Sequence, residues 1–125
     1  MTDQNNEEQG RILKPQLHED IVKNALVANP MVNSTTLFRK SVALEIGKYD
    51  ETLLQFADWD FWLKMGLVGK LYNFPKHFLY YQMWNEGSSF ARQRENALSA
   101  LRIVRKYSNR YPKYFIALGA TILLA

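Results

Sequence analysis

The chain has 125 residues, of which 47% are hydrophobic and 14% aromatic, and it contains no cysteine. These values predict one globular domain that buries roughly two thirds of its unfolded surface, and they exclude a disordered chain. The lack of cysteine excludes a disulfide framework, a zinc–thiolate site and a thiol nucleophile, and it suits a reducing compartment. Because Met1–Gln9 also lacks the features of a secretory signal, we expect a cytoplasmic protein.

The formal net charge of +4 is concentrated towards the C-terminus. The range Arg92–Lys113 holds seven Lys or Arg residues and one acid, Glu95, whereas acids outnumber bases in the rest of the chain. Such a stretch indicates an anionic partner, such as lipid headgroups or phosphates, or else a solvated helix face. We expect no nucleic-acid partner, because the basic stretch lacks interleaved aromatic residues and any known binding motif.

The first part of the chain predicts a helix followed by a strand. A polar N-terminal segment, residues 1–16, comes first. Apolar residues at helical spacing predict a helix over residues 17–28, which Asn29-Pro30 ends. β-Branched and aromatic residues then predict a short strand over Met31–Arg39.

Two helices are expected in the middle of the chain. Ser41–Ile46 predicts a short helix closed by Gly47, because glycine tolerates the left-handed conformation common just past a helix end. After a loop, Asp58–Val68 predicts a second helix with apolar residues on one face. Asp58 stands where a carboxylate can cap its first turn.

The C-terminal part predicts two strands and a long helix. The aromatic runs Leu71–Phe74 and Phe78–Met83, separated by Pro75, predict strands that flank a turn. From Ser89 to Tyr111-Pro112, apolar residues recur at helical spacing and predict a long amphipathic helix with a basic outer face.

The last segment, Tyr114–Ala125, is uncharged and too short to span a membrane by itself. Three structures are compatible with it: an interfacial helix, a helix packed on the core, or part of a longer hydrophobic segment.

Several segments carry a recognisable order of motifs. They are Asn-Ser-Thr-Thr-Leu-Phe-Arg-Lys at 33–40, Glu-Ile-Gly-Lys-Tyr-Asp-Glu at 45–51, Ala-Asp-Trp-Asp-Phe-Trp-Leu-Lys at 57–64, and a glycine, proline and Tyr-rich stretch at 69–81. In this order and at this spacing they resemble consecutive motifs of the family 2 glycosyltransferases. The resemblance spans roughly residues 29–89, and its specificity comes from the combination, because each motif alone is common by chance.

The resemblance implies a fold and an activity. The fold is an α+β fragment: the C-terminal, acceptor-side half of a GT-A-type α/β glycosyltransferase, with short mixed strands, flanking helices and a long C-terminal amphipathic helix. Residues 17–91 would form the acceptor-side subdomain, and residues 92–125 the basic helix and apolar tail. The activity is transfer of a sugar from a nucleotide-sugar donor to a hydroxyl of a glycan or lipid-linked acceptor, by an inverting, nonprocessive enzyme.

The resemblance also implies site residues. Asp58 occupies the position of the catalytic base, although Ala57 stands where the family commonly has Glu; the alternative is that Asp58 is a plain helix N-cap. Asp60, Trp59 and Trp84 are candidates for acceptor binding. The alternative for Asp60 is a structural role as a cap or as partner of a basic residue, and for Trp84 it is ordinary packing.

The donor-binding half, with its Asp-x-Asp motif, is not recognisable in this sequence. The resemblance implies a divalent metal, Mg or Mn, for the full-length enzyme, but we expect none to bind this fragment alone. His18 and His77 lie far apart and have no companion ligand at metal spacing.

The basic helix suggests a contact with a membrane or a phosphate. Arg102, Arg105 and Lys106 lie near one face of it, and an apolar segment follows. A peripheral location at the inner face of the membrane is therefore one expectation, and a solvated helix with a core-packed tail is the other. A noncatalytic remnant or accessory module that binds a membrane surface or a partner subunit stands as the alternative to the enzyme.

Overall fold

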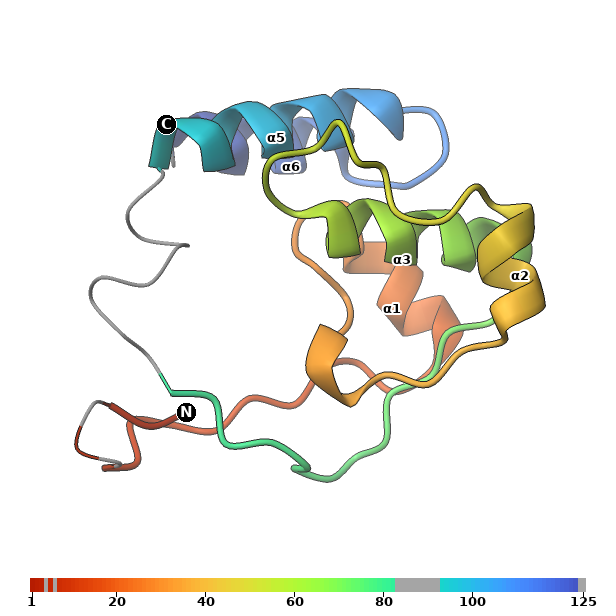
Figure 1. Cartoon of the computed structure of the whole chain (residues 1–125). Coiled ribbons are helices and arrows are strands. Elements are labelled where there is room, and N and C mark those ends of the chain that lie inside the picture. The colour runs from red at the N-terminus through yellow and green to blue at the C-terminus, as the bar shows by residue number, and fades with distance from the viewer. Residues whose placement is uncertain (4, 6, 83–92, 124–125) are drawn as a thin grey trace.

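The computed structural model describes residues 1–3, 5, 7–82 and 93–123, and its described part is mainly helical (Figure 1). The elements, in chain order, are α1 (His18–Asn24), the 3₁₀ turn η1 (Asn33–Thr35), α2 (Lys40–Glu45), α3 (Ala57–Val68), α5 (Gln93–Lys106) and α6 (Tyr114–Leu123). No β-sheet forms among the described residues, where β-type pairing is limited to the isolated bridges Thr2–Glu8 and Thr2–Gln82.

The predicted α+β fragment with mixed strands, as in the C-terminal half of a GT-A-type glycosyltransferase, is therefore wrong. Within the predicted strand Met31–Arg39 the chain forms η1 instead. There the hydroxyl of Thr35 donates to the carbonyl of Val32 at 3.1 Å, and that of Thr36 to the carbonyl of Asn33 at 2.8 Å. Such local side-chain bonds give the backbone an alternative to a strand.

The other two predicted strands also fail to form. Residues 71–74 and 78–82 contain no strand, and Met83, the last residue of the second prediction, lies outside the described residues. High β-propensity describes a segment that fits a pleated, half-buried surface, and a strand still needs a neighbour to pair with. In the described part of the chain, β-type pairing of these runs is limited to the single bridge between Gln82 and Thr2, and most of their side chains are exposed.

The predicted helices form, with shifted ends. α1 covers the middle of the prediction over 17–28, and turns follow it up to Asn29-Pro30. α2 ends at Glu45, and Gly47 just after its C-cap Ile46 has a φ of 83°, the left-handed conformation predicted for the glycine that closes this helix. α5 covers part of the predicted long helix and is followed by turns up to Tyr111; residues 89–92 of that prediction lie outside the description.

The helix α3 lies between the α5–α6 pair and α1 (Figure 1), and its side chains belong to two buried clusters. One side packs with α5, α6 and the end of α1 in a cluster that includes Trp59, Leu63 and Val104. The other side packs against α1 and α2 through Phe61 and Trp62. A helix that is apolar nearly all round is expected at the core of a domain. The position of α3 fixes the directions in which its two acids point.

The segment Tyr114–Ala125 forms α6 over residues 114–123, which packs beside α5 (Figure 1). Ala117 and Thr121 are buried on its inner side. Its outer side carries exposed apolar residues, namely Phe115, Ile116, Ile122 and Leu123. None of the helices in the described ranges combines the length and the apolarity needed to cross a bilayer.

Candidate functional site

Three of the motifs noted in the sequence meet at the start of α3. Tyr49, from the second motif, donates its hydroxyl to the side-chain oxygen of Asn33, from the first, at 3.4 Å. The Tyr49 ring also stacks on Phe61 of α3, with ring centroids 4.4 Å apart. Burial, together with the nearby charge of Asp58, raises the pKa of Tyr49. Asp58, Tyr49 and Asn33 therefore belong to one neighbourhood.

The chain enters α3 through an unusual conformation at Phe56. This residue is the N-cap of α3 and has φ 60° and ψ 25°, in the left-handed region that bulky side chains rarely adopt. Its ring packs edge-on against Trp59, at a centroid distance of 6.1 Å. The turn makes Ala57 the first helical residue and brings Asp58 into the first turn, where the helix N-terminus favours a negative charge.

Asp58 is half-buried, and one of its two carboxylate oxygens is held. The side-chain amide of Asn29 donates to Oδ2 of Asp58 at 2.8 Å. Asn29 is fixed in turn, because its own side-chain oxygen accepts the N–H of Met31 at 3.2 Å, and Lys14 donates to its carbonyl at 2.9 Å. Oδ1 of Asp58 makes no hydrogen bond with the described residues.

The alternative of a plain N-cap does not fit this geometry. The N-cap position belongs to Phe56, and no side chain makes a capping hydrogen bond at this end of α3. Asp58 is instead a carboxylate oriented through Oδ2, and its Oδ1 has no hydrogen-bond partner in the part of the chain that the structure describes.

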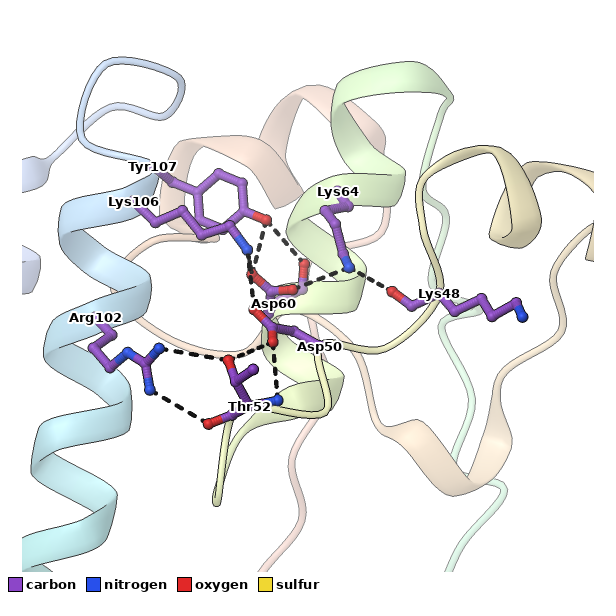
Figure 2. Close-up of polar contacts among 8 residues, drawn as sticks. All are labelled: Lys48, Asp50, Thr52, Asp60, Lys64, Arg102, Lys106 and Tyr107. Carbon is purple, nitrogen blue, oxygen red and sulfur yellow. Dashed lines mark hydrogen bonds and ion pairs between the residues drawn. The ribbon is translucent and has the colours of Figure 1, made fainter.

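Asp60, two residues further on, lies in a different environment (Figure 2). Its side chain is fully buried. Oδ1 accepts a hydrogen bond from the ammonium of Lys106 at 2.7 Å and one from the hydroxyl of Tyr107 at 2.9 Å. Oδ2 lies 3.2 Å from the ammonium of Lys64, in a contact that lacks the alignment of a hydrogen bond and is therefore electrostatic.

This arrangement identifies Asp60 as the partner of basic residues, which is one of the two roles the sequence suggested. The buried carboxylate ties α5 to α3 through Lys106 and Tyr107. Burial, followed by the Asp60 charge, strongly raises the pKa of the Tyr107 hydroxyl, so this hydroxyl remains a proton donor.

The loop before α3 joins the same network (Figure 2). Oδ1 of Asp50 accepts the backbone N–H of Thr52 at 3.0 Å and its hydroxyl at 2.6 Å, while Oδ2 lies 3.5 Å from Lys106. The Thr52 bonds, followed by the Lys106 charge, lower the pKa of Asp50. Arg102 donates to the carbonyl of Thr52 at 3.3 Å and contacts its hydroxyl at 3.5 Å.

The three basic residues singled out on α5 therefore have different environments. Lys106 points at Asp60 and Asp50, and its side chain is only 45% exposed. Arg102 is exposed and donates to the carbonyl of Thr52 in the loop before α3. Arg105 is exposed, and its guanidinium makes no hydrogen bond or ion pair with the described residues. Lys106 is thus the least available of the three for an external anion.

Of the two tryptophans predicted to bind an acceptor, the structure describes only Trp59. Trp59 is 7% exposed, and its indole N–H donates to the carbonyl of Ala25 at 2.7 Å. These contacts favour a packing role for Trp59. Trp84 lies outside the described residues.

The residues around Asp58 and Asp60 do not fit a divalent metal ion. Within the described ranges, no three His, Asp or Glu side chains lie together as a metal-binding group. The oxygens of Asp60, which a metal would need, already face Lys64, Lys106 and Tyr107. His18 accepts the backbone N–H of Leu71 at its Nδ1, at 3.1 Å, and so acts as a structural residue.

Sequence reasoning missed the residues that orient the two acids. Asn29 was interpreted only as a helix stop, and its pairing with Asp58 joins positions 29 residues apart. Tyr107 falls within the amphipathic helix predicted from Ser89 to Tyr111, and its hydroxyl donates to Asp60, 47 positions away. No local pattern signals such contacts, although a tyrosine on a buried helix face needs a partner for its hydroxyl.

Comparison with protein families, with curated proteins and with solved structures finds no match to this chain. The site is therefore interpreted from its own geometry and from the order of its motifs.

Proposed function

We propose that this chain takes part in sugar transfer from a nucleotide-sugar donor to an acceptor hydroxyl, as the acceptor-side part of a family 2-type glycosyltransferase. One observation carries the proposal: residues of three motifs lie together at α3, where Tyr49 hydrogen-bonds to Asn33 and stacks on Phe61 near the half-buried carboxylate of Asp58. Asn29 holds Oδ2 of this carboxylate, and Oδ1 has no hydrogen-bond partner among the described residues. The helical architecture gives no support of its own, so the proposal depends on this convergence and on the motif order.

In the proposed reaction Asp58 is the general base. Oδ1 accepts the proton of the acceptor hydroxyl while the acceptor oxygen bonds to the anomeric carbon and the nucleotide diphosphate leaves. Asn29 holds Oδ2 and thereby fixes the direction of Oδ1. Because a carboxylate is a much weaker base than an alkoxide, most of the rate gain has to come from positioning the hydroxyl.

The proposal assigns the donor and the divalent metal, Mg or Mn, to sequence outside these 125 residues. Single addition of a sugar is proposed over polymerisation, and inversion at the anomeric carbon follows from direct attack by the acceptor. The glycan or lipid-linked nature of the acceptor remains part of the proposal.

The proposal is tested by Asp58→Asn in the full-length protein. We expect sugar transfer to fall by at least about a hundredfold, the range for loss of a general base, while donor binding persists. Glu19→Gln is the matched control, because Glu19 is also an acid in a first helical turn, that of α1. Turnover of Asp58→Asn within a few-fold of wild type would refute the assignment.

A second candidate function is a module that binds a membrane surface, and the outer side of α6 favours it. Phe115 is 82% and Leu123 89% exposed, and with Ile116 and Ile122 they recur at helical spacing along one stripe. An interfacial helix presents such a stripe to lipid. If this candidate is correct, the protein is cytoplasmic and bound peripherally at the inner face of the membrane.

Sedimentation with anionic vesicles tests this second candidate. The double variant Phe115→Ser with Ile122→Ser should lose vesicle binding. Leu54→Ser, at an exposed apolar residue of the loop before α3, should bind like wild type. Equal binding by both variants would exclude α6 as the membrane contact.

A further inference from the structure

A second polar region, separate from the proposed base, lies between α5 and the loop before α3. A pocket of about 450 Å³ opens there, lined by Asp50, Leu53, Asp60, Arg102, Ile103, Arg105 and Lys106. Asp58 is not among these residues, because positions two apart on a helix differ by about 200° around its axis. The pocket therefore is not part of the site proposed for the acceptor hydroxyl.

The charges at the inner end of the pocket cancel. Asp50 and Asp60 supply two negative charges, while Lys106 and Lys64 supply two positive charges within 3.5 Å of them. A buried carboxylate paired in this way offers little attraction to a cation and little repulsion to an anion. The charge that remains in the pocket belongs to Arg102 and Arg105.

The two arginines retain hydrogen-bonding capacity. Arg102 uses two of its N–H groups in long contacts, 3.3 and 3.5 Å, with Thr52. Arg105 uses none with the described residues. A guanidinium has five donors in a planar fork, and residues three apart on a helix are neighbours on its surface. Arg102 and Arg105 therefore place two guanidinium groups side by side at the pocket.

From these observations we infer that the pocket between α5 and the loop at residues 50–53 binds a phosphoryl group through Arg102 and Arg105. Paired guanidinium forks match the tetrahedral oxygens of a phosphate, and such charge-assisted bonds are among the strongest hydrogen bonds in proteins. Leu53 and Ile103 provide apolar walls for the group that carries the phosphate. The Lys106–Asp60 pair is a structural tie that holds α5 in place at the pocket.

The phosphoryl group can come from a soluble phosphate ester or from a lipid headgroup, since both present the same oxygens. This inference does not rest on the proposed function, because none of its residues takes part in the proposed proton transfer. It also separates Lys106 from the two arginines with which the sequence grouped it.

The experiment titrates the chain with inorganic phosphate and with glycerol 3-phosphate at low ionic strength, with chloride at matched ionic strength as the reference. Arg105→Gln should weaken phosphate binding about tenfold, the factor for one lost charge-assisted pair, and the double variant Arg102→Gln with Arg105→Gln should abolish it. Because the Arg105 side chain makes no hydrogen bond or ion pair with the described residues, its single variant should retain the fold, which far-ultraviolet circular dichroism checks.

Arg110→Gln is the matched control: Arg110 is an exposed arginine just past α5 that does not line the pocket, and its loss should leave binding within about twofold of wild type. A parallel arm uses vesicles containing phosphatidic acid. Arginine-dependent binding to these vesicles alone assigns the lipid source, and arginine-dependent binding to soluble phosphates alone assigns the soluble source; either supports the site.

Two outcomes overturn the inference. One is equal weakening by Arg105→Gln and Arg110→Gln, which would show general charge attraction. The other is the absence of phosphate-dependent binding in both arms. The variant Phe115→Ser with Ile122→Ser should keep phosphate binding, so membrane contact through α6 and phosphoryl binding in the pocket remain distinguishable.

Discussion

Asp58 and Asp60 lie on the same helix, two residues apart, and yet have opposite environments. Asp58 is half-buried and has one oxygen held by a neutral amide, while the other makes no hydrogen bond with the described residues. Asp60 is fully buried and faces two ammonium groups and a tyrosine hydroxyl. The difference shows that two acids at a helix mouth can have different environments, one partly open and one buried and paired, depending on which side of the helix the rest of the chain covers.

The largest effect that would test this division is on stability. Asp60→Asn should lower the free energy of unfolding by about 3 kcal/mol, because removing one partner of a buried ion pair leaves the other charges uncompensated. Asp58→Asn should change it by less than about 0.5 kcal/mol, because the Asn29 amide pairs with a carbonyl oxygen as well as with a carboxylate. Chemical denaturation measures both values. Equal losses for the two variants would remove the distinction.

The next effect is a loss of stability at alkaline pH. Burial raises the pKa of Tyr111 to about 12, and the pKa of Tyr107 shifts in the same direction. A group whose pKa is raised on folding stabilises the fold fully below its unfolded pKa, about 10, and loses this contribution as the pH rises through the folded value. The free energy of unfolding should therefore fall between pH 10 and about 12.

Tyr111→Phe isolates one part of this alkaline loss. The Tyr111 hydroxyl donates to the carbonyl of Leu63 at 2.7 Å, away from both aspartates. The variant should reduce the loss between pH 10 and 12 by roughly 2 kcal/mol, according to the size of the shift. Denaturation curves across this range measure it; an unchanged pH dependence would contradict the prediction.

A smaller effect is expected at Tyr107. Tyr107→Phe removes one of the hydrogen bonds to Asp60 and keeps the ring in place, so the free energy of unfolding should fall by about 1 kcal/mol. In a double-mutant cycle with Asp60→Asn, the two changes should be non-additive, because they share one contact. Additive losses would show that the hydroxyl does not support the buried carboxylate.

The smallest effect concerns the orientation of Asp58. Asn29→Ala should cost about 0.5–1 kcal/mol of stability, since its amide bridges α3 to the segment before η1. In the full-length protein the same change should lower the rate of sugar transfer by more than the loss of folded protein explains. The loss of rate should be smaller than that of Asp58→Asn. Transfer rates measured well below the unfolding temperature distinguish the two effects, and an unchanged rate would show that Asn29 does not orient the base.

The local part of the fold was predictable. Apolar spacing located the helices that became α1, α3 and α5, and Gly47 marked the end of α2, because helix periodicity and C-terminal glycine are properties of a few neighbouring residues. The predicted strands at Met31–Arg39 and at the aromatic runs failed, because a strand depends on a partner that lies elsewhere in the chain.

The candidate site was predictable in part. The motif order singled out Asp58 and Asp60 and offered a basic partner for Asp60. The motif order did not indicate that Asn29 and Tyr107 contact these acids, because the contacts join distant positions of the chain. The basic helix face grouped Lys106 with Arg102 and Arg105, because the sequence does not show which of these residues has a carboxylate next to it.

The sequence by itself determined that the chain is globular, that its helices fall near these positions, and that two acids stand in the first turn of a helix rich in apolar residues. The tertiary structure alone decided which acid is buried. Because α3 is apolar on nearly every side, its pattern leaves the rotation of the helix open, and the packing of Trp59, Phe61 and Trp62 into two clusters fixes it. That rotation turns Asp60 towards Lys106 and places Asp58 beside Asn29.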